Sequence, residues 1–167
     1  YKENAGIFGH TNPWIMIAEA VVGDGNRAFE YYSRINPSAR EEISEVHRCE
    51  PYVYAQMIAG KDAATHGEAK NSWLSGTAAW NYVAISQWIL GIRPTFTGLQ
   101  IAPVIPDDWQ GFTATRQYRG VNYHIEVVRV GLGNQLQLSV EGQPLEGTVV
   151  PFNLDRSEVH VKVSIGA

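Results

Sequence analysis

Residues 70–80 read KNSWLSGTAAW, and the rest of the chain can be interpreted outward from them. The stretch passes from polar residues through small ones into an apolar segment, which predicts a helix over residues 77–90. Ser75, Gly76 and Thr77 stand where this helix begins. A helix N-terminus carries unpaired backbone N–H groups and the positive end of the macrodipole, so it attracts anions. The same residues are also typical of an ordinary helix cap, and the sequence leaves both interpretations open.

Three more helices are expected in the first half of the chain. Asn12-Pro13 is a helix start signal, and residues 14–22 are apolar almost all round, which predicts deep burial. Residues 25–35 form an amphipathic pattern, and residues 52–59 follow Glu50-Pro51 as a further apolar segment. A long polar loop is expected over residues 61–75. Because the loops of helix bundles usually have only about two to eight residues, this order indicates layers of an α-helical barrel.

The composition changes after Gly91 to short segments in which apolar and polar residues alternate. Residues 112–118 and 121–130 predict a hairpin that turns at Arg119-Gly120, and residues 135–140 and 159–165 repeat the alternation. Alternation with period two places one face of a strand inside and the other in water. The sequence therefore predicts an α+β chain, with helices over residues 1–91 and an antiparallel β-sandwich domain over residues 92–167.

The totals exclude several classes of protein. The chain has 167 residues, 44% of them hydrophobic and 18% charged, which is enough to bury a core. A net charge of −4 argues against a nucleic-acid partner, and no apolar run reaches the roughly 18 residues of a membrane span. Cys49 is the only cysteine, so neither an intrachain disulfide nor a cysteine metal cluster can form. A cytoplasmic protein without a bound metal is the expectation.

Four polar side chains are candidates for binding. His10 lies between a glycine-rich loop and a helix start, where it could donate to an anion or cap the chain. Lys2 and Glu3 could contact sugar hydroxyls or form an ordinary surface pair. Gln56 stands among apolar residues, so its amide needs a partner, either a ligand or a neighbouring loop.

Several familiar catalytic patterns are absent from the sequence. There is no glycine-rich nucleotide loop, no His-Glu-x-x-His and no serine nucleophile elbow. Asp107-Asp108 follow Pro106 in a predicted turn and are interpreted as structural. No carboxylate pair stands out for hydrolysis, so a sugar enzyme built on this chain would need its acid elsewhere.

Several longer segments, in their order along the chain, carry a family resemblance. They are residues 1–10, 12–14, 50–56, 71–80, 90–94 and 108–112. Together they resemble the C-terminal part of cellobiose phosphorylase and its relatives in glycoside hydrolase family 94, over about residues 1–130. The resemblance implies the end of an (α/α)6 barrel followed by a jelly-roll-like β-sandwich.

The resemblance also implies a reaction, in which cellobiose and phosphate give α-D-glucose 1-phosphate and D-glucose with inversion. Inorganic phosphate is the co-substrate, no cofactor is implied, and a homodimer is expected. Phosphate replaces the water and the general base of an inverting hydrolase, so a single carboxylic acid suffices to protonate the leaving oxygen.

Site residues follow from the resemblance position by position. His10 and Thr77 match the phosphate ligands, and Gln56 matches a residue that lines the phosphate and the reacting sugar. Lys2 and Glu3 match contacts to the leaving glucose. The general-acid Asp and a phosphate-binding Arg lie upstream of these motifs, so we expect a C-terminal piece that holds no catalytic residue and is inactive alone.

The sequence leaves several other functions open. A sister phosphorylase could act on chitobiose, laminaribiose, cellodextrin or cellobionic acid. A non-catalytic carbohydrate-binding module and an ordinary hydrolase of the helical-barrel kind are the other candidates. Ala5 and Gly9 depart from the residues common in the family, which leaves the fine specificity open.

Overall fold

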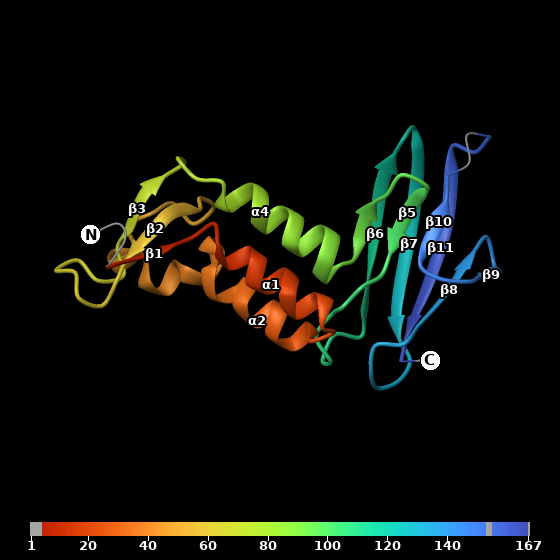
Figure 1. Cartoon of the computed structure of the whole chain (residues 1–167), viewed down its shortest axis with the longest axis horizontal. Helices are drawn as coiled ribbons and strands as arrows, with labels where there is room; N and C mark the ends of the chain where they lie inside the picture. The colour runs from red at the N-terminus through yellow and green to blue at the C-terminus, as the bar shows by residue number, and fades with distance from the viewer. Residues whose placement is uncertain (1–4, 153–154, 167) are drawn as a thin grey trace.

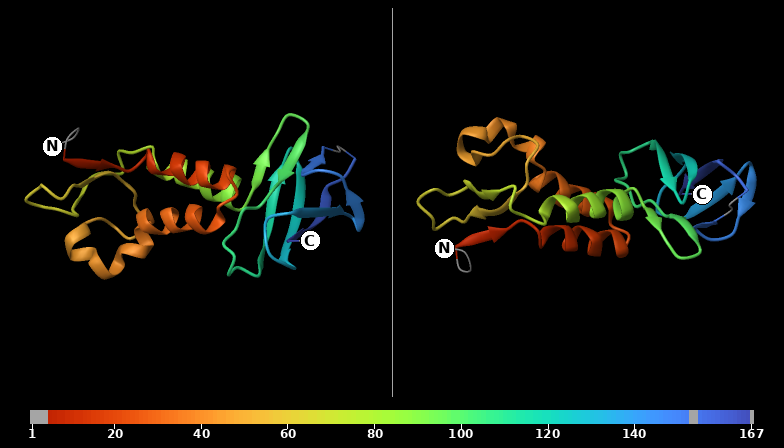
Figure 2. Two further views of the ribbon diagram at one scale, coloured as in Figure 1. Left: turned by 60° about the horizontal axis from the view of Figure 1, so that its bottom comes forward. Right: turned by 90° about the horizontal axis from the view of Figure 1, so that it is seen from above.

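The computed structural model describes residues 5–152 and 155–166. A small sheet, a layer of helices and a β-rich unit follow one another along the long axis of the molecule (Figure 1). The two rotated views in Figure 2 show the same order, with the helices between the small sheet and the β-rich unit. The described part therefore contains both helices and sheets, as predicted.

Three helical segments form the middle layer. α1 spans Asn12–Val21, and α2 spans Gly25–Ile35, with the bounds that the sequence predicts for the second helix. The side chain of Asp24 caps α2 by accepting a hydrogen bond from the backbone N–H of Arg27. α4 spans Thr77–Val83 and continues as a π-helix, η2, over Ala84–Ile89, so the helix predicted over 77–90 is confirmed.

The deep burial predicted for the first helix is wrong. Met16 and Ala20 of α1 are buried, but Ile15 is 54% exposed and Val22, just after the helix, is 76% exposed. α1 packs against α2 and α4–η2 on one side only. The apolar side chains of Ile15 and Val21, on the rest of the helix surface, are therefore largely exposed.

The helix predicted over residues 52–59 is also wrong, because residues 55–59 form a strand. β1 (Gly6–Phe8), β2 (Ala55–Ala59) and β3 (Ala69–Ser72) make an antiparallel sheet in the order β1-β2-β3. Within β2, buried residues alternate with half-buried ones, which is the period of a strand. Its two neighbours satisfy its backbone groups, and β3 occupies part of the predicted loop 61–75.

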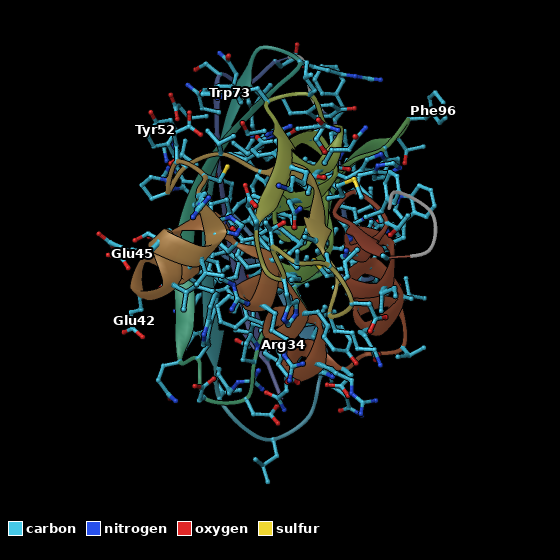
Figure 3. The ribbon with its side chains drawn as sticks, turned by 90° about the vertical axis from the view of Figure 1, so that its left-hand side faces the viewer. Arg34, Glu42, Glu45, Tyr52, Trp73 and Phe96 are labelled. Atoms are coloured by element: carbon cyan, nitrogen blue, oxygen red, sulfur yellow. The ribbon has the colours of Figure 1, made fainter. Side chains whose placement is uncertain are left out.

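Two short helical segments connect α2 to this sheet. The 3₁₀ helix η1 spans Pro37–Ile43, and α3 spans Ser44–His47. The side chain of Asn36 accepts a hydrogen bond from the backbone N–H of Ser38 at the start of η1. This connection, labelled at Glu42 and Glu45 in Figure 3, lies beside the small sheet.

Two sheets make up the β-rich unit. One has three strands in the order β10-β5-β4, and the other has five in the order β6-β7-β11-β8-β9. The strands are β4 (Ile92–Pro94), β5 (Gly98–Ile101), β6 (Gly111–Tyr118), β7 (Val121–Arg129), β8 (Leu136–Val140), β9 (Gln143–Leu145), β10 (Val149–Pro151) and β11 (Glu158–Ile165).

The two sheets share one apolar core. Leu99 and Ile101 of the smaller sheet belong to the same buried cluster as Tyr123, Ile125 and Val163 of the larger one. The hairpin predicted around Arg119-Gly120 is confirmed as β6–β7. The prediction of purely antiparallel strands is wrong in one place, because β11 runs parallel to β7 while it runs antiparallel to β8.

Hydrogen bonds join the helices to the β-rich unit. The backbone N–H of Val104 donates to the carbonyl oxygen of Ile89 at 2.9 Å. Asn26 at the start of α2 donates to the carboxylate of Asp107 at 2.7 Å and accepts from its backbone N–H at 2.9 Å. Asp107 thus has a structural contact here, in line with its interpretation from the sequence. The division at residues 91 and 92 stays a prediction.

None of the helices in the described residues is both long enough and apolar enough to cross a membrane.

Candidate functional site

His10 lies in the turn that connects β1 to α1. The backbone N–H of Gly9 donates to the carbonyl oxygen of Gln56 at 2.7 Å, which continues the β1–β2 pairing by one residue. The side chain of Asn12 donates to the carbonyl oxygens of Phe8 and Gly9 at 2.7 and 3.1 Å. These hydrogen bonds, made by residues on both sides of His10, fix the backbone of the turn.

The ring of His10 belongs to a row of aromatic side chains. Its centroid lies 6.1 Å from that of Phe8 and 6.1 Å from that of Trp14, in edge-to-face arrangements. Trp14 in turn meets Trp80, in the first turn of α4, at 5.7 Å. This row connects His10 to the start of α4, for which the sequence leaves both anion binding and an ordinary helix cap open.

Thr77 is buried at the first position of α4, with 1% of its surface exposed. Its hydroxyl donates to the carbonyl oxygen of Ala55 at 3.3 Å, and its backbone N–H donates to the hydroxyl of Ser75 at 3.0 Å. The two hydroxyls are also hydrogen-bonded to each other. Ser75, just before the N-cap residue Gly76, therefore accepts from the first backbone N–H of the helix and contacts the Thr77 hydroxyl.

Gly9 brings the His10 turn directly against Thr77. A Cβ added to Gly9 would lie 2.8 Å from Thr77 Oγ1 and 2.7 Å from the carbonyl oxygen of Ala55. In this chain a side chain at position 9 would push these groups apart, so glycine allows the backbone to lie this close. Residues 9–10 and the N-terminus of α4 are thus neighbours, although 67 positions separate His10 from Thr77 in the sequence.

Gln56 lies on β2, whereas the sequence predicts it inside a helix. Its side chain is half-buried, and its Oε1 accepts a hydrogen bond from Nδ2 of Asn71 at 2.8 Å. The sequence leaves open whether a ligand or a neighbouring segment satisfies this amide. One end of the amide is satisfied by Asn71, a residue that sequence reasoning did not single out.

A cavity of about 250 Å³ lies beside the start of α4. Gly9, Ala55 and Thr77 form part of its wall, and the lining includes the cationic side chains of Arg34 and Arg40 together with His47. Burial lowers the pKa of His47, and the charge of Arg40 lowers it further. Neither His10 nor Gln56 lines this cavity, so the structure brings their backbones to Thr77 without placing their side chains in it.

Two exposed aromatic side chains meet near the start of α4, one from the segment before β2 and one from the loop between β3 and α4. Tyr52 and Trp73, labelled in Figure 3, meet edge to face with ring centroids 6.3 Å apart. The indole N–H of Trp73 donates to the carboxylate of Glu50 at 3.2 Å. A hydrogen bond from its own backbone N–H, together with that indole bond, lowers the pKa of Glu50. This arrangement fixes the loop that leads to Ser75 and Thr77.

Lys2 and Glu3 lie outside the described residues, so their assignment to the leaving sugar stays a prediction. Within residues 5–152 and 155–166, no group of three or more His, Cys, Asp or Glu side chains is arranged to hold a metal ion. The upstream general acid also stays an expectation.

Comparisons with known proteins identify the family. Residues 1–91 match the family described as "Glycosyl hydrolase 94 superfamily, catalytic domain". The chain is 44% identical over 153 residues to an N,N'-diacetylchitobiose phosphorylase of Vibrio proteolyticus, covering 90% of this chain and 19% of that protein. It is 48% identical over 126 residues to the enzyme of the same name from Vibrio furnissii, covering 75% and 16%.

A third relative carries a different name. The chain is 33% identical over 155 residues to a solabiose phosphorylase of Paenibacillus borealis, covering 90% of this chain and 20% of that protein. The chain thus spans about a fifth of the length of these relatives. Because the family match covers more than half of its residues, the chain belongs to the glycosyl hydrolase 94 superfamily.

Proposed function

We propose that this chain supplies the phosphate-binding side of an inverting disaccharide phosphorylase. The observation that carries the proposal is the close approach of Gly9 to Thr77, which brings the His10 turn against the start of α4. Membership of the family and the phosphorylase names of its relatives support the same reaction class. Phosphate attacks the anomeric carbon of the disaccharide, and the products are a sugar 1-phosphate and a free sugar.

In this proposal His10 and Thr77 bind phosphate, and each contributes a hydrogen-bond donor to its oxygens. The bond from the Thr77 hydroxyl to Ala55 is long, at 3.3 Å, so exchanging it for a charged phosphate oxygen favours binding. Gln56 contacts phosphate and the reacting sugar. These groups hold phosphate in line with the glycosidic bond that breaks. Phosphate then attacks from a fixed position, which removes the entropic cost of bringing it from solution.

The remaining parts of the reaction belong to groups outside the described residues. Lys2 and Glu3 bind the leaving sugar, and a general-acid Asp and an Arg from the rest of the enzyme complete the site. Inorganic phosphate is a co-substrate and no cofactor takes part. We further propose that the enzyme is a cytoplasmic homodimer that binds no nucleic acid, and that residues 1–91 close an (α/α)6 barrel before a jelly-roll-like domain.

Two disaccharides are candidates for the substrate. The resemblance of the sequence motifs favours cellobiose, whereas the names of the two Vibrio relatives favour N,N'-diacetylchitobiose. Both candidates are β-1,4-linked and differ at the 2-position, where one carries hydroxyls and the other acetamido groups. Activity of the complete enzyme with each disaccharide distinguishes between them.

An assay of the complete enzyme with each disaccharide tests this function. Incubation with cellobiose, N,N'-diacetylchitobiose, laminaribiose or cellobionic acid is expected to release sugar 1-phosphate from one of them, and only when phosphate is present. Phosphate-independent release of two free sugars would instead identify a hydrolase. Sugar binding that calorimetry finds unaffected by phosphate, with no product formed, would identify a binding module.

A further inference from the structure

Asn71 and Gln56 lie between two paired positions of the small sheet. The register pairs Ala55 with Ser72 and Met57 with Lys70, so the two amides face each other across β2 and β3. Opposite residues of an antiparallel pair point to the same face of the sheet, where their side chains can interact. Asn71 Nδ2 indeed donates to Gln56 Oε1 at 2.8 Å.

The direction of this hydrogen bond determines what Gln56 offers to a ligand. A glutamine amide has an acceptor oxygen at one end and two N–H donors at the other. Because Asn71 occupies the oxygen, the Nε2 end points elsewhere, and it has no hydrogen-bond partner among the residues that the structure describes. An anion is bound by donors, so an amide held in this orientation presents the end that phosphate requires.

Asn71 holds this orientation from an unusual backbone conformation. Its φ is 53°, in the left-handed region, which is uncommon for a residue other than glycine. Asn and Asp adopt this region more readily than other residues with side chains, so the position favours a short polar residue. The Asn71 side chain is exposed, and a single neutral hydrogen bond at such a site contributes only about 1 kcal/mol to stability. The hydrogen bond to Gln56 therefore contributes little to the stability of the fold.

We propose that Asn71 is a positioning residue, which turns the amide of Gln56 so that its N–H groups face the bound phosphate. The inference rests on the proposed function and deepens it, because it adds a residue outside the set that the family resemblance assigns. It predicts that reversing the hydrogen-bonding polarity at position 71 turns the Gln56 amide round and presents its oxygen to phosphate.

The test uses Asn71→Asp in the complete enzyme. Aspartate has nearly the same shape and tolerates the same φ, but it accepts hydrogen bonds where asparagine donates them. We expect the KM for phosphate to rise about 10-fold, corresponding to the loss of one hydrogen bond to a charged group. The KM for the disaccharide and the thermal midpoint should stay close to those of the parent enzyme. Asn71→Gly, which keeps the backbone conformation and leaves Gln56 free to turn, should give a smaller rise.

A double-mutant cycle separates positioning from simple repulsion by the new carboxylate. In a Gln56→Ala background, Asn71→Asp is expected to cause no further rise in the KM for phosphate. A further rise of about 10-fold in that background would mean that charge repulsion acts without Gln56, and it would overturn the inference.

The failure of the inference can be told apart from failure of the proposed function. If Gln56→Ala raises the KM for phosphate while Asn71→Asp behaves like the parent, Gln56 binds phosphate without help from Asn71 and the positioning role is refuted. If Gln56→Ala leaves the KM for phosphate unchanged, the assignment of Gln56 to the phosphate site fails, and the role of Asn71 fails with it.

Discussion

Replacing His10 with alanine in the complete enzyme is expected to lower kcat/KM for phosphate about 100-fold, as the loss of one positioned donor to a reacting anion does. His10 directly follows Gly9, which lies against Thr77. Removal of the imidazole therefore takes a hydrogen-bond donor from the proposed phosphate site. Steady-state rates at varied phosphate and saturating disaccharide measure the effect. A variant whose dependence on phosphate equals that of the parent would refute the assignment of His10.

The packing of the His10 ring calls for a second variant. The ring meets Phe8 and Trp14 edge to face, so alanine removes aromatic contacts as well as the donor. His10→Phe keeps an aromatic ring without any hydrogen-bonding group, and it should retain the thermal midpoint while losing activity as alanine does. His160→Ala is the matched control, since His160 is an exposed residue on β11 that stacks on His124, in the β-rich unit. Its kcat/KM should equal that of the parent.

Replacing Gly91 with alanine is expected to lower the free energy of unfolding by about 3 kcal/mol or more, through backbone strain together with overpacking. Gly91 ends the α4–η2 helix with a φ of +70° and is buried. A Cβ at this position would lie 2.1 Å from the carbonyl oxygen of Ala102 and 2.4 Å from the nitrogen of Pro103. Both are backbone atoms, so the connection between the helix and β4 would have to move.

Chemical denaturation of the intact protein measures this loss, and Gly142→Ala is its control. Gly142 has a similar φ of +78°, but no atom lies within 4 Å of the added Cβ. Its substitution should therefore cost only the backbone term, about 1 kcal/mol. Equal losses in the two variants would show that steric contact at Gly91 contributes nothing.

Elements that depend on residues close together in the sequence were predicted correctly. The bounds of α2 follow from an amphipathic repeat over residues 25–35, and the β6–β7 hairpin follows from alternation around Arg119-Gly120. Residues 55–59 were not predicted correctly, because a short apolar run fits a helix or a strand equally well. Pairing with β1 and β3, both distant in the sequence, makes this segment a strand.

The site was predictable only through family resemblance. Nothing local in the sequence shows that Gly9 contacts Thr77, because the contact depends on how β1 and α4 pack. Asn71 was missed for a similar reason, since its role requires both the left-handed backbone and the register that places it opposite Gln56. His10 and Thr77 are predicted as phosphate ligands from the family resemblance. The structure shows that the turn containing His10 lies against Thr77.

The position of β11 has a consequence for how the protein is made. This strand, the last of the described strands in sequence, lies between β7 and β8 and joins the β6–β7 hairpin to the β8–β9 hairpin. Until residues 158–165 emerge from the ribosome, the two hairpins have no common partner and their inner edges stay open to pairing with other chains. Assembly of the five-stranded sheet must therefore wait for the end of this segment's synthesis, and contacts of such high sequence separation form slowly.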